Sequence, residues 1–368
     1  MSRKIKVLHY GLSENKGGIE NVVFSWLKNK PGDITFDFVN DTGNKLGYED
    51  EFKNYGCHVY TVTHRYTNPI KHKNELKALI DSEKYDYIHC HVMTLIEPVE
   101  GMICENNSHC SAIYHCHSMY KGLKFPLKEK MLQNYTSIIL NNKHIYRMAC
   151  GKDAGDFMFK GKPFTVIENG VDFKSFSFNA NARKEIRNKL SISDNEIVIG
   201  HVGHECFEKN YPFMFESFSK LIKENNSYKL LLIGNMDKSD WIKDLIKKYR
   251  IKNNVIFTGM VNNAKDFYSA MDLFYLPSVN EGFPVVLIEA QASGLPCVVS
   301  DRVTKDTKIS NDYHFISLNI DDAVKIIKNI KLCEDRKNII LDSKYDVKNS
   351  SNKLFEFYRN NLKVKILD

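Results

Sequence analysis

Short apolar runs alternate with segments of helical periodicity along nearly the whole chain. A run such as 5–10 is typical of a buried strand, and the segment 19–28 that follows it has the apolar spacing of a helix. Neighbouring parallel strands need a crossover of this kind, and the helices then cover both faces of the sheet. The alternation therefore predicts an α/β fold with doubly wound parallel sheets. The expected strands are 5–10, 34–40, 58–62, 85–91, 111–117, 137–141, 164–168, 197–202, 229–234, 255–259, 273–276 and 296–300.

A turn and a polar stretch interrupt this alternation once. The turn signal Asn169–Gly170 precedes the polar stretch, after which strand-like runs begin again. The length of 368 residues also suits two domains. We expect one domain from 1–175 together with a returning amphipathic helix in 345–368, and a second domain from 176–344. Ligands bind beyond the carboxyl ends of the strands in such sheets, so we expect the site in a cleft between two Rossmann-like domains.

Composition and charge narrow the compartment and the ligand class. The chain has no run of about 18 apolar residues and no secretory signal, and its nine cysteines lie scattered without C-x-x-C spacing. We therefore expect a cytoplasmic protein with reduced thiols. The net charge of +7 favours anionic ligands. Nucleic acid is not an expected partner, because no helix-turn-helix, RNA-recognition or zinc-finger pattern accompanies the charge.

The segment Ser278–Pro296 carries the strongest chemical signal. It follows the buried run 273–276 and opens a predicted helix, in which Pro284 suits the first helical position. Gly282 allows a ligand to approach the backbone closely. An anion such as a diphosphate would meet free amide groups there, with the helix dipole behind them. The amides expected to face it are those of Phe283, Val285 and Val286.

Two glutamates of this segment are candidate ligand contacts. Glu281 lies in the loop and Glu289 about two turns into the helix, so they do not form a paired acid and base. We interpret them as hydrogen-bond acceptors for sugar hydroxyls at two heights in the cleft. The alternative is a solvated loop glutamate and a second one favoured by the helix dipole.

The string E-G-F-P-x4-E-A-x-A-x-G-x-P after a strand resembles the E-x7-E signature of retaining GT-B glycosyltransferases of family four, also called group 1. The resemblance covers nearly the whole chain and is most similar to capsular and exopolysaccharide transferases, in which a string like Tyr114–Ser118 recurs. The other matching segments are 16–20, 168–172, 200–210, 231–234 and 255–259.

The resemblance implies a GT-B enzyme that moves a hexose from a nucleotide sugar, with UDP as the first guess, to a lipid-linked or polysaccharide acceptor. It implies retention of the anomeric configuration and no metal ion or other cofactor, and no D-x-D motif is present. It assigns Lys209 to the β-phosphate of the donor, where charge develops as the bond breaks. His117 would touch the donor sugar, and the backbone near Val261 would line the base pocket. The loop with Gly17 and Gly18 would face donor and acceptor, and its glycines permit a sharp turn at a helix start.

One position departs from the family pattern. His204 stands where the motif of the second domain normally carries an arginine. Arginine is always charged and binds phosphate in a bidentate manner, whereas histidine titrates near neutral pH. A protonated histidine could replace the arginine. The alternatives are a catalytically weak homologue that stabilises an active partner, and a nucleotide-sugar epimerase of similar architecture.

Two histidine pairs end predicted strands. His89 and His91 flank one cysteine, and His115 and His117 flank another, so strand alternation places the histidines of each pair on one face. Four such side chains could bind zinc or iron. The interpretation that we favour keeps His117 in the cleft and the other three packed or hydrogen-bonded.

A basic segment suggests an anionic partner for the first domain. Residues 121–162 carry nine Lys and Arg against three Asp and Glu. The part that mixes this charge with apolar residues contains Lys121, Lys124, Lys128 and Lys130. An anionic membrane surface or a lipid diphosphate acceptor would be attracted to it. The alternative is an ordinary solvated surface.

Overall fold

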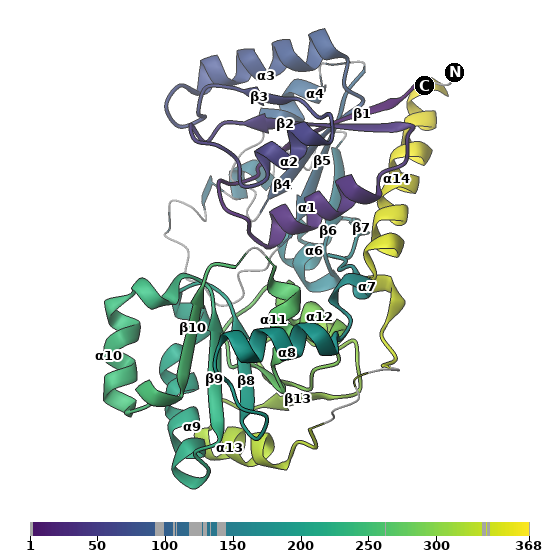
Figure 1. The fold of residues 1–368 in the computed structure, drawn as a ribbon. Helices are drawn as coiled ribbons and strands as arrows, with labels where there is room; N and C mark the ends of the chain where they lie inside the picture. Colours follow the sequence, from purple (N-terminus) through teal and green to yellow (C-terminus); the bar gives the residue numbers. More distant parts are fainter. Residues whose placement is uncertain are drawn as a thin grey trace. The chain divides into compact units, whose positions relative to one another are not determined.

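The computed structural model describes residues 3–92, 99–105, 107, 109–117, 127, 131–132, 134–137, 145–261, 263–332, 336 and 339–367. The chain divides into two compact units, each built around its own parallel sheet (Figure 1). The first unit comprises residues 1–170 and 344–368, and the second unit comprises residues 171–343.

The first unit contains a seven-stranded parallel sheet in the order β3-β2-β1-β4-β5-β6-β7. Its strands are β1 (Ile5–Tyr10), β2 (Ile34–Asn40), β3 (Val59–Thr61), β4 (Tyr87–Val92), β5 (Ser111–Cys116), β6 (Ile145–Ala149) and β7 (Thr165–Val166). The strand expected at 137–141 was wrong at its start, because Ser137 is helical. The remainder, 138–141, lies outside the described residues. The strand paired between β5 and β7 is β6.

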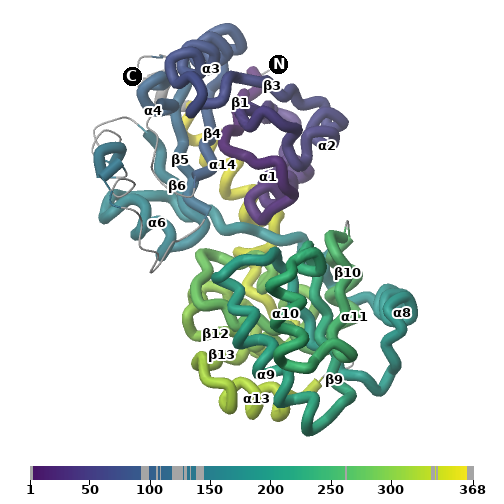
Figure 2. Tube along the Cα trace, turned by 90° about the vertical axis from the view of Figure 1, so that its left-hand side faces the viewer, coloured from purple at the N-terminus to yellow at the C-terminus, as the bar shows by residue number. Residues whose placement is uncertain are grey.

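Helices lie on both faces of this sheet (Figures 1 and 2). They are α1 (Gly18–Asn29), α2 (Glu49–Asn54), α3 (Pro69–Glu83), α4 (Val99–Glu105), α6 (Lys152–Phe159) and α14 (Val347–Leu367). The last helix, α14, lies beside α1 and buries Leu354, Phe355 and Tyr358. Local sequence explains the start of α3, where the Asn68 side chain accepts from the amide of Lys71 and Pro69 follows.

The second unit contains a six-stranded parallel sheet in the order β10-β9-β8-β11-β12-β13. Its strands are β8 (Ile197–Val202), β9 (Tyr228–Ile233), β10 (Val255–Gly259), β11 (Leu273–Leu276), β12 (Cys297–Ser300) and β13 (Tyr313–Ile316). Its helices are α7 (Phe173–Phe176), α8 (Ala180–Lys189), α9 (Tyr211–Glu224), α10 (Asp240–Tyr249), α11 (Ala264–Ala270), α12 (Val285–Ala292) and α13 (Ile320–Asn329). The predicted α/β architecture with doubly wound parallel sheets is thus confirmed, whereas the edge strand β13 was not expected.

Two apolar cores fill the faces of the second sheet. One lies between the sheet and the helices α9, α10 and α13, and the other between the sheet and α8, α11 and α12. On the second side, the carboxylate of Asp272 accepts hydrogen bonds from Arg183 and Arg187 of α8, at 2.6 and 3.2 Å. The same carboxylate accepts from the amide of Val198 at 2.7 Å. This network ties α8 to the first residues of β8 and β11.

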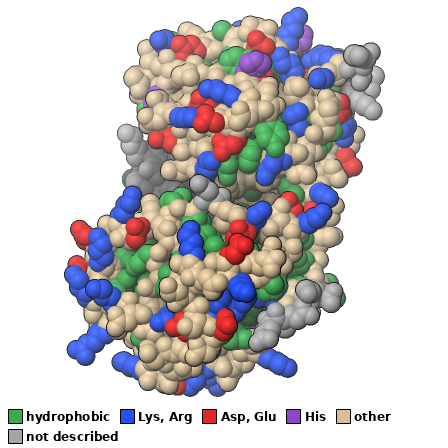
Figure 3. All heavy atoms as spheres, viewed as in Figure 1, with side chains coloured by type: hydrophobic (Ala, Val, Ile, Leu, Met, Phe, Trp, Pro, Cys, Tyr) green, Lys and Arg blue, Asp and Glu red, His purple; other side chains and the backbone are tan. Residues whose placement is uncertain are grey.

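The described residues contain no helix long and apolar enough to cross a membrane. Basic and acidic side chains are interspersed over the visible face of both units (Figure 3). The excess of positive charge is therefore not gathered into a single patch on that face.

Candidate active site

Glycine residues line the carboxyl edge of the second sheet after β8 and β9 and at the end of β10. The amide of Gly203 donates to the carbonyl of Ile233, and the amide of Gly234 donates to the carbonyl of Gly259, both at 3.0 Å. Gly234 has φ of +138°, and a Cβ atom there would overlap the carbonyl oxygen of Gly203. Position 234 therefore requires glycine for these strand ends to come this close together.

The predicted Lys209 and Glu281 meet at the same edge. The Nζ atom of Lys209 lies 2.7 Å from Oε1 of Glu281, and the lysine is buried. The hydroxyl of Ser278 donates to the same carboxylate oxygen at 3.0 Å. Burial of an ion pair is favourable only with such additional hydrogen bonds. The structure thus joins two residues that lie in separate motifs of the sequence.

Two hydrogen bonds hold the loops that carry this pair. The amide of Val279 donates to the carbonyl of Glu208 at 2.8 Å, and Nδ2 of Asn210 donates to the carbonyl of Pro277 at 3.2 Å. Asn210 has φ of +56°, a left-handed conformation that asparagine tolerates better than most residues. The loop after β8 is therefore fastened to the loop after β11, which fixes the position of the Lys209 ammonium group.

Helix α12 begins one residue later than the sequence suggested. Pro284 is the residue before the helix, and Val285 is the first helical residue. The first turn is closed by the amide of Leu287, which donates to the carbonyl of Pro284 at 3.0 Å. The amides of Val285 and Val286 precede this bond, so they belong to the helix end that attracts anions.

Glu289 lies in a different environment from Glu281. Its side chain is partly buried, and Oε2 accepts a hydrogen bond of 2.6 Å from the hydroxyl of Tyr268 in α11. Burial raises the pKa of Glu289 to about 7, and the hydrogen bond from Tyr268 opposes this rise. Glu289 therefore changes its protonation state near neutral pH.

The remaining predicted donor contacts lie at the strand ends, and one buried histidine was missed. His204 is exposed, and its backbone carbonyl accepts from the hydroxyl of Tyr211 at 3.0 Å. Val261 is half-buried just beyond β10.

His201, at the end of β8, is buried and bonds through Nδ1 to the carbonyl of Tyr275 at 3.0 Å. Burial and then the charge of Lys209 lower the pKa of His201 to about 3, so it is neutral. Its position on the buried face of a predicted strand was the available signal.

In the first unit, Glu20 organises the loop that contains the predicted Gly17 and Gly18. Its carboxylate accepts from the amide and from the hydroxyl of Ser13, both at 2.8 Å. A Cβ atom at Gly17 would lie 2.7 Å from Oε2 of Glu20, whereas one at Gly18 would meet no atom within 4 Å. Gly17 therefore lets Glu20 fold back over the loop. Glu20 was not among the predicted site residues.

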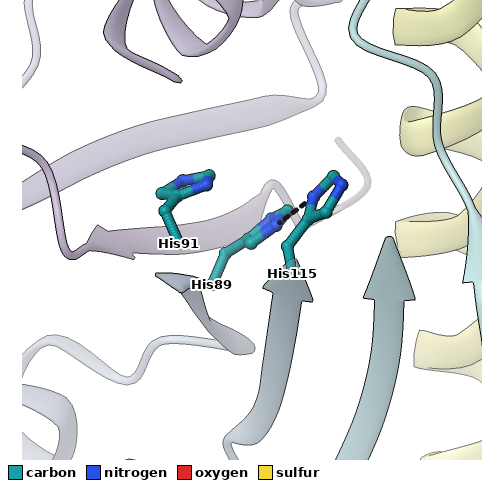
Figure 4. Close-up of side chains that lie close together, drawn as sticks. All are labelled: His89, His91 and His115. Carbon is teal, nitrogen blue, oxygen red and sulfur yellow. Dashed lines mark hydrogen bonds between the residues drawn. The ribbon is translucent and has the colours of Figure 1, made fainter. Parts of the chain in front are cut away.

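Five buried histidines lie side by side on the face of the first sheet that α1 and α14 cover. The strand register pairs His9 with His89 and His91 with His115, and Figure 4 shows three of these rings at the strand ends. His117 follows β5 and stacks on His115, with ring centroids 4.1 Å apart. Trp26 of α1 covers the cluster. The predicted common face of each pair is confirmed, and His9 extends it.

Hydrogen bonds connect these rings into chains. Nδ1 of His9 lies 3.0 Å from Nε2 of His91, and Nδ1 of His91 lies 2.9 Å from Nε2 of His117. His89 is bonded to His115 at 3.0 Å and to the hydroxyl of Tyr358 at 2.6 Å. Nitrogens of His89, His91 and His115 come within 4.8 Å of one another. A metal ion there would have to displace these bonds, because both nitrogens of His89 and of His91 are engaged, so the residues do not fit a metal centre as they stand.

The first chain has a defined direction. Oδ1 of Asn169 can only accept, and Nδ1 of His117 lies 3.0 Å from it, so this nitrogen carries the hydrogen. Nε2 of His117 then accepts from His91, and Nε2 of His91 accepts from His9. The chain ends at Nε2 of His9, a lone pair that has no partner among the described residues. Burial lowers the pKa of His117 to about 4, so the ring is neutral.

This geometry constrains the role expected for His117. The side chain is buried and both ring nitrogens are bonded. A hydrogen bond to a donor sugar would therefore require one of these bonds to open.

The basic residues expected to contact a membrane or an acceptor lie outside the described residues. They are Lys121, Lys124, Lys128 and Lys130. Helical positions within the same segment are described at Leu127, Met131 and Tyr135. These side chains recur every four residues and are 75%, 64% and 62% exposed. The three side chains are therefore apolar, helical and exposed where the structure describes them.

Known proteins resemble this chain in sequence and in fold. Residues 182–344 match the family model described as glycosyl transferases group 1. A Bacillus subtilis (strain 168) protein named as a glycosyltransferase, EpsF, is 27% identical, over 83% of this chain and 81% of its own length. An Escherichia coli protein named UDP-Gal:alpha-D-GlcNAc-diphosphoundecaprenol alpha-1,3-galactosyltransferase is 25% identical, over 93% of this chain and 91% of its own.

The fold is shared with a solved structure that contains a nucleotide. The crystal structure of Anabaena Alr3699/HepE in complex with UDP and glucose has a TM-score of 0.78 to this chain at 18% identity. The alignment covers 97% of this chain and 100% of that protein. The chain thus has the GT-B fold and is a glycosyltransferase, and residues 182–344 of its second unit resemble the group 1 glycosyl transferases.

Proposed function

We propose that this protein transfers a hexose from a UDP-sugar to a lipid-linked or polysaccharide acceptor, with retention of configuration and without a metal ion. The observation that carries the proposal is the ion pair of Lys209 and Glu281 at the carboxyl edge of the second sheet. A lysine held there can neutralise the charge that develops on a leaving diphosphate.

The donor would bind to the second unit through three kinds of group. Lys209 supplies a positive charge, and the amides of Val285 and Val286 supply donors at a helix end that favours anions. Glu289 would accept hydrogen bonds from sugar hydroxyls. This set stabilises a diphosphate with protein groups alone, which supports a metal-independent reaction.

The relatives support the choice of donor and acceptor. Structures of the Anabaena protein are titled as complexes with UDP and with UDP-glucose. The name of the Escherichia coli relative gives UDP-Gal as donor and a diphosphoundecaprenol-linked sugar as acceptor. We transfer both classes to this chain as part of the proposal.

Retention is proposed to proceed by attack of the acceptor hydroxyl on the face from which the diphosphate leaves. Glu281 is a poor covalent nucleophile here, because Lys209 and Ser278 both bind the same carboxylate oxygen. The front-face route needs no protein nucleophile and uses Lys209 only to stabilise charge.

The acceptor is proposed to bind to the first unit at the cytoplasmic face of the membrane. The exposed side chains of Leu127, Met131 and Tyr135 lie in the segment that also carries the four lysines. Apolar side chains flanked by lysines suit adsorption to an anionic lipid surface.

Calorimetric titration with UDP, GDP and ADP in the presence of a chelator tests the donor site. We expect UDP to bind, and Lys209→Met to weaken binding by about 10-fold or more, because a hydrogen bond to a charged group is lost. Lys220→Met is the matched control, since this half-buried lysine forms a surface ion pair with Asp321. Equal affinity of Lys209→Met and wild type for UDP would contradict the proposal.

His204 favours a second candidate, a catalytically weak homologue that stabilises an active partner. The exposed imidazole has no permanent charge to offer the phosphate. Under this candidate His204→Arg restores no sugar transfer and the protein co-purifies with its partner. Transfer by the wild type would exclude it, and an epimerised UDP-sugar formed without acceptor would instead favour an epimerase.

A further inference from the structure

Tyr268 connects the core of the second unit to Glu289. Its side chain is fully buried, and its ring lies 5.8 Å from each of the rings of Phe176 and Phe274. The backbone carbonyl of Tyr268 accepts from Nη1 of Arg336 at 3.2 Å. The ring and the backbone are thus both held, and the hydroxyl emerges at α12.

The hydroxyl of Tyr268 is aimed at a carboxylate that the core does not otherwise hold. It donates to Oε2 of Glu289 at 2.6 Å and lies 3.5 Å from the carbonyl of Val286. A bond of this length to a carboxylate is typical of a strong, charge-assisted hydrogen bond. Glu289 itself is half-buried on α12.

We propose that Tyr268 is a positioning residue for the nucleotide-sugar donor, which holds Oε2 of Glu289 so that Oε1 is left to accept hydrogen bonds from the donor's sugar hydroxyls. The inference deepens the proposed function and rests on it, because Glu289 is taken as a donor contact. Tyr268 itself does not touch the ligand.

The same contact controls the charge of Glu289. Burial raises the pKa of Glu289 to about 7, and the hydrogen bond from Tyr268 acts in the opposite direction. Burial raises the pKa of the Tyr268 phenol well above its usual range, so it remains a donor. Loss of this hydroxyl would leave more of Glu289 protonated at neutral pH, and a protonated carboxyl accepts fewer hydrogen bonds.

Other ionisable groups near α12 are less suited to this role. Cys297 of β12 is buried, and burial raises the pKa of its thiol well above the usual range, so it stays neutral. The charged residues on the other elements packed against α12 are the exposed Lys174, Lys265, Lys305 and Asp306 and the half-buried Asp266.

Tyr268→Phe removes the hydroxyl and keeps the ring, and Tyr275→Phe is the matched control. Tyr275 is also buried in the second unit, and its hydroxyl lies 3.0 Å from the hydroxyl of Ser217. We expect Tyr268→Phe to weaken UDP-sugar binding by about 10-fold near neutral pH. This loss of affinity should shrink toward pH 9, because Glu289 of the variant ionises again there. Tyr275→Phe should change the affinity by less than about 2-fold at every pH. Equal affinities of Tyr268→Phe and wild type, or an equal loss in both variants, would overturn the proposal.

A second readout separates this proposal from the proposed function. Carbon-13 NMR of labelled glutamate follows the carboxyl of Glu289 without any ligand, with Glu289→Gln identifying the signal. We expect Tyr268→Phe to raise the pKa of Glu289, whereas Tyr275→Phe leaves it unchanged. An unchanged pKa in Tyr268→Phe would overturn the positioning role. If Tyr268→Phe raises the pKa of Glu289 but the wild-type protein binds no nucleotide, the Tyr268–Glu289 coupling is retained and the donor site is refuted.

Discussion

Mild acid should destabilise the first unit through its buried histidines. Burial lowers the pKa of His9 to about 3 and of His117 to about 4, and it places the pKa values of His89, His91 and His115 well below the usual value. All five rings are therefore neutral in the folded protein at pH values where an unfolded chain protonates them.

The sign and size of the effect follow from this difference. Between pH 6.5, the usual histidine value, and about 4, the unfolded state binds more protons than the folded state, so stability falls as the pH falls. At about pH 5.5 each neutral histidine costs about 1.4 kcal/mol relative to neutral pH, and five together cost about 7 kcal/mol. This loss is comparable with the whole stability of a typical domain, about 5–15 kcal/mol.

Urea titrations followed by tryptophan fluorescence can measure this loss. The chain has two tryptophans, so in a Trp241→Phe background the remaining Trp26 reports on the cluster that it covers. The free energy of unfolding is extrapolated to water at about pH 7.5, 6.5 and 5.5, and its slope against pH gives the number of protons that the chain takes up when it unfolds. We expect an uptake of about four protons near pH 6.

The same substitution at a buried and at an exposed histidine provides the control. His9→Gln should lower the proton uptake on unfolding by nearly one, since His9 is fully buried, and His109→Gln at an exposed histidine is the matched control. An uptake of one proton or fewer in the Trp241→Phe protein would refute the conclusion that the cluster is neutral and buried.

Two further substitutions test packing and charge by urea denaturation. Gly155→Ala would place a Cβ atom in overlap with three ring carbons of Phe164, so we expect a loss of about 1–3 kcal/mol, while Gly32→Ala, where no atom lies within 4 Å, should cost less than about 0.5 kcal/mol. Asp272→Ala removes the carboxylate partner of the buried Arg187 and should cost about 3–5 kcal/mol, and a loss below about 1 kcal/mol would contradict the ion-pair assignment.

The fold class could be predicted because apolar runs and helical segments alternate along the sequence with little ambiguity. The strands that the sequence did not predict, β6 and β13, are short and only partly apolar. Strand β6, which was not expected, carries Arg147 in its centre and is therefore less apolar than the other strands around it. The edge strand β13 has only four residues, and two of them are half-buried. Pairing within the sheet, which local sequence does not encode, selected these segments.

The candidate site was predictable as a set of residues but not as a set of contacts. The motif resemblance singled out Lys209, Glu281 and Glu289, and the structure adds their partners. Nothing local to the sequence indicates that Lys209 bonds Glu281, or that Tyr268 bonds Glu289, because the first pair joins two strand-to-helix connections and the second joins two helices. Strand alternation likewise gave the common face of the histidines, whereas their hydrogen bonds depend on the register of three strands.

The string 168–172 shows how one short motif can serve the structure of a unit. Asn169 sets the direction of the histidine chain through His117. Its neighbour Glu168 accepts from Lys353 of α14 at 3.1 Å, and a Cβ atom at Gly170 would overlap the hydroxyl of Ser350 in the same helix. Three consecutive residues thus fasten the end of the first sheet to the returning helix and to the buried imidazoles. Because Tyr358 of α14 also bonds His89, protonation of the cluster would weaken both attachments together, which makes this helix the element expected to loosen first in acid.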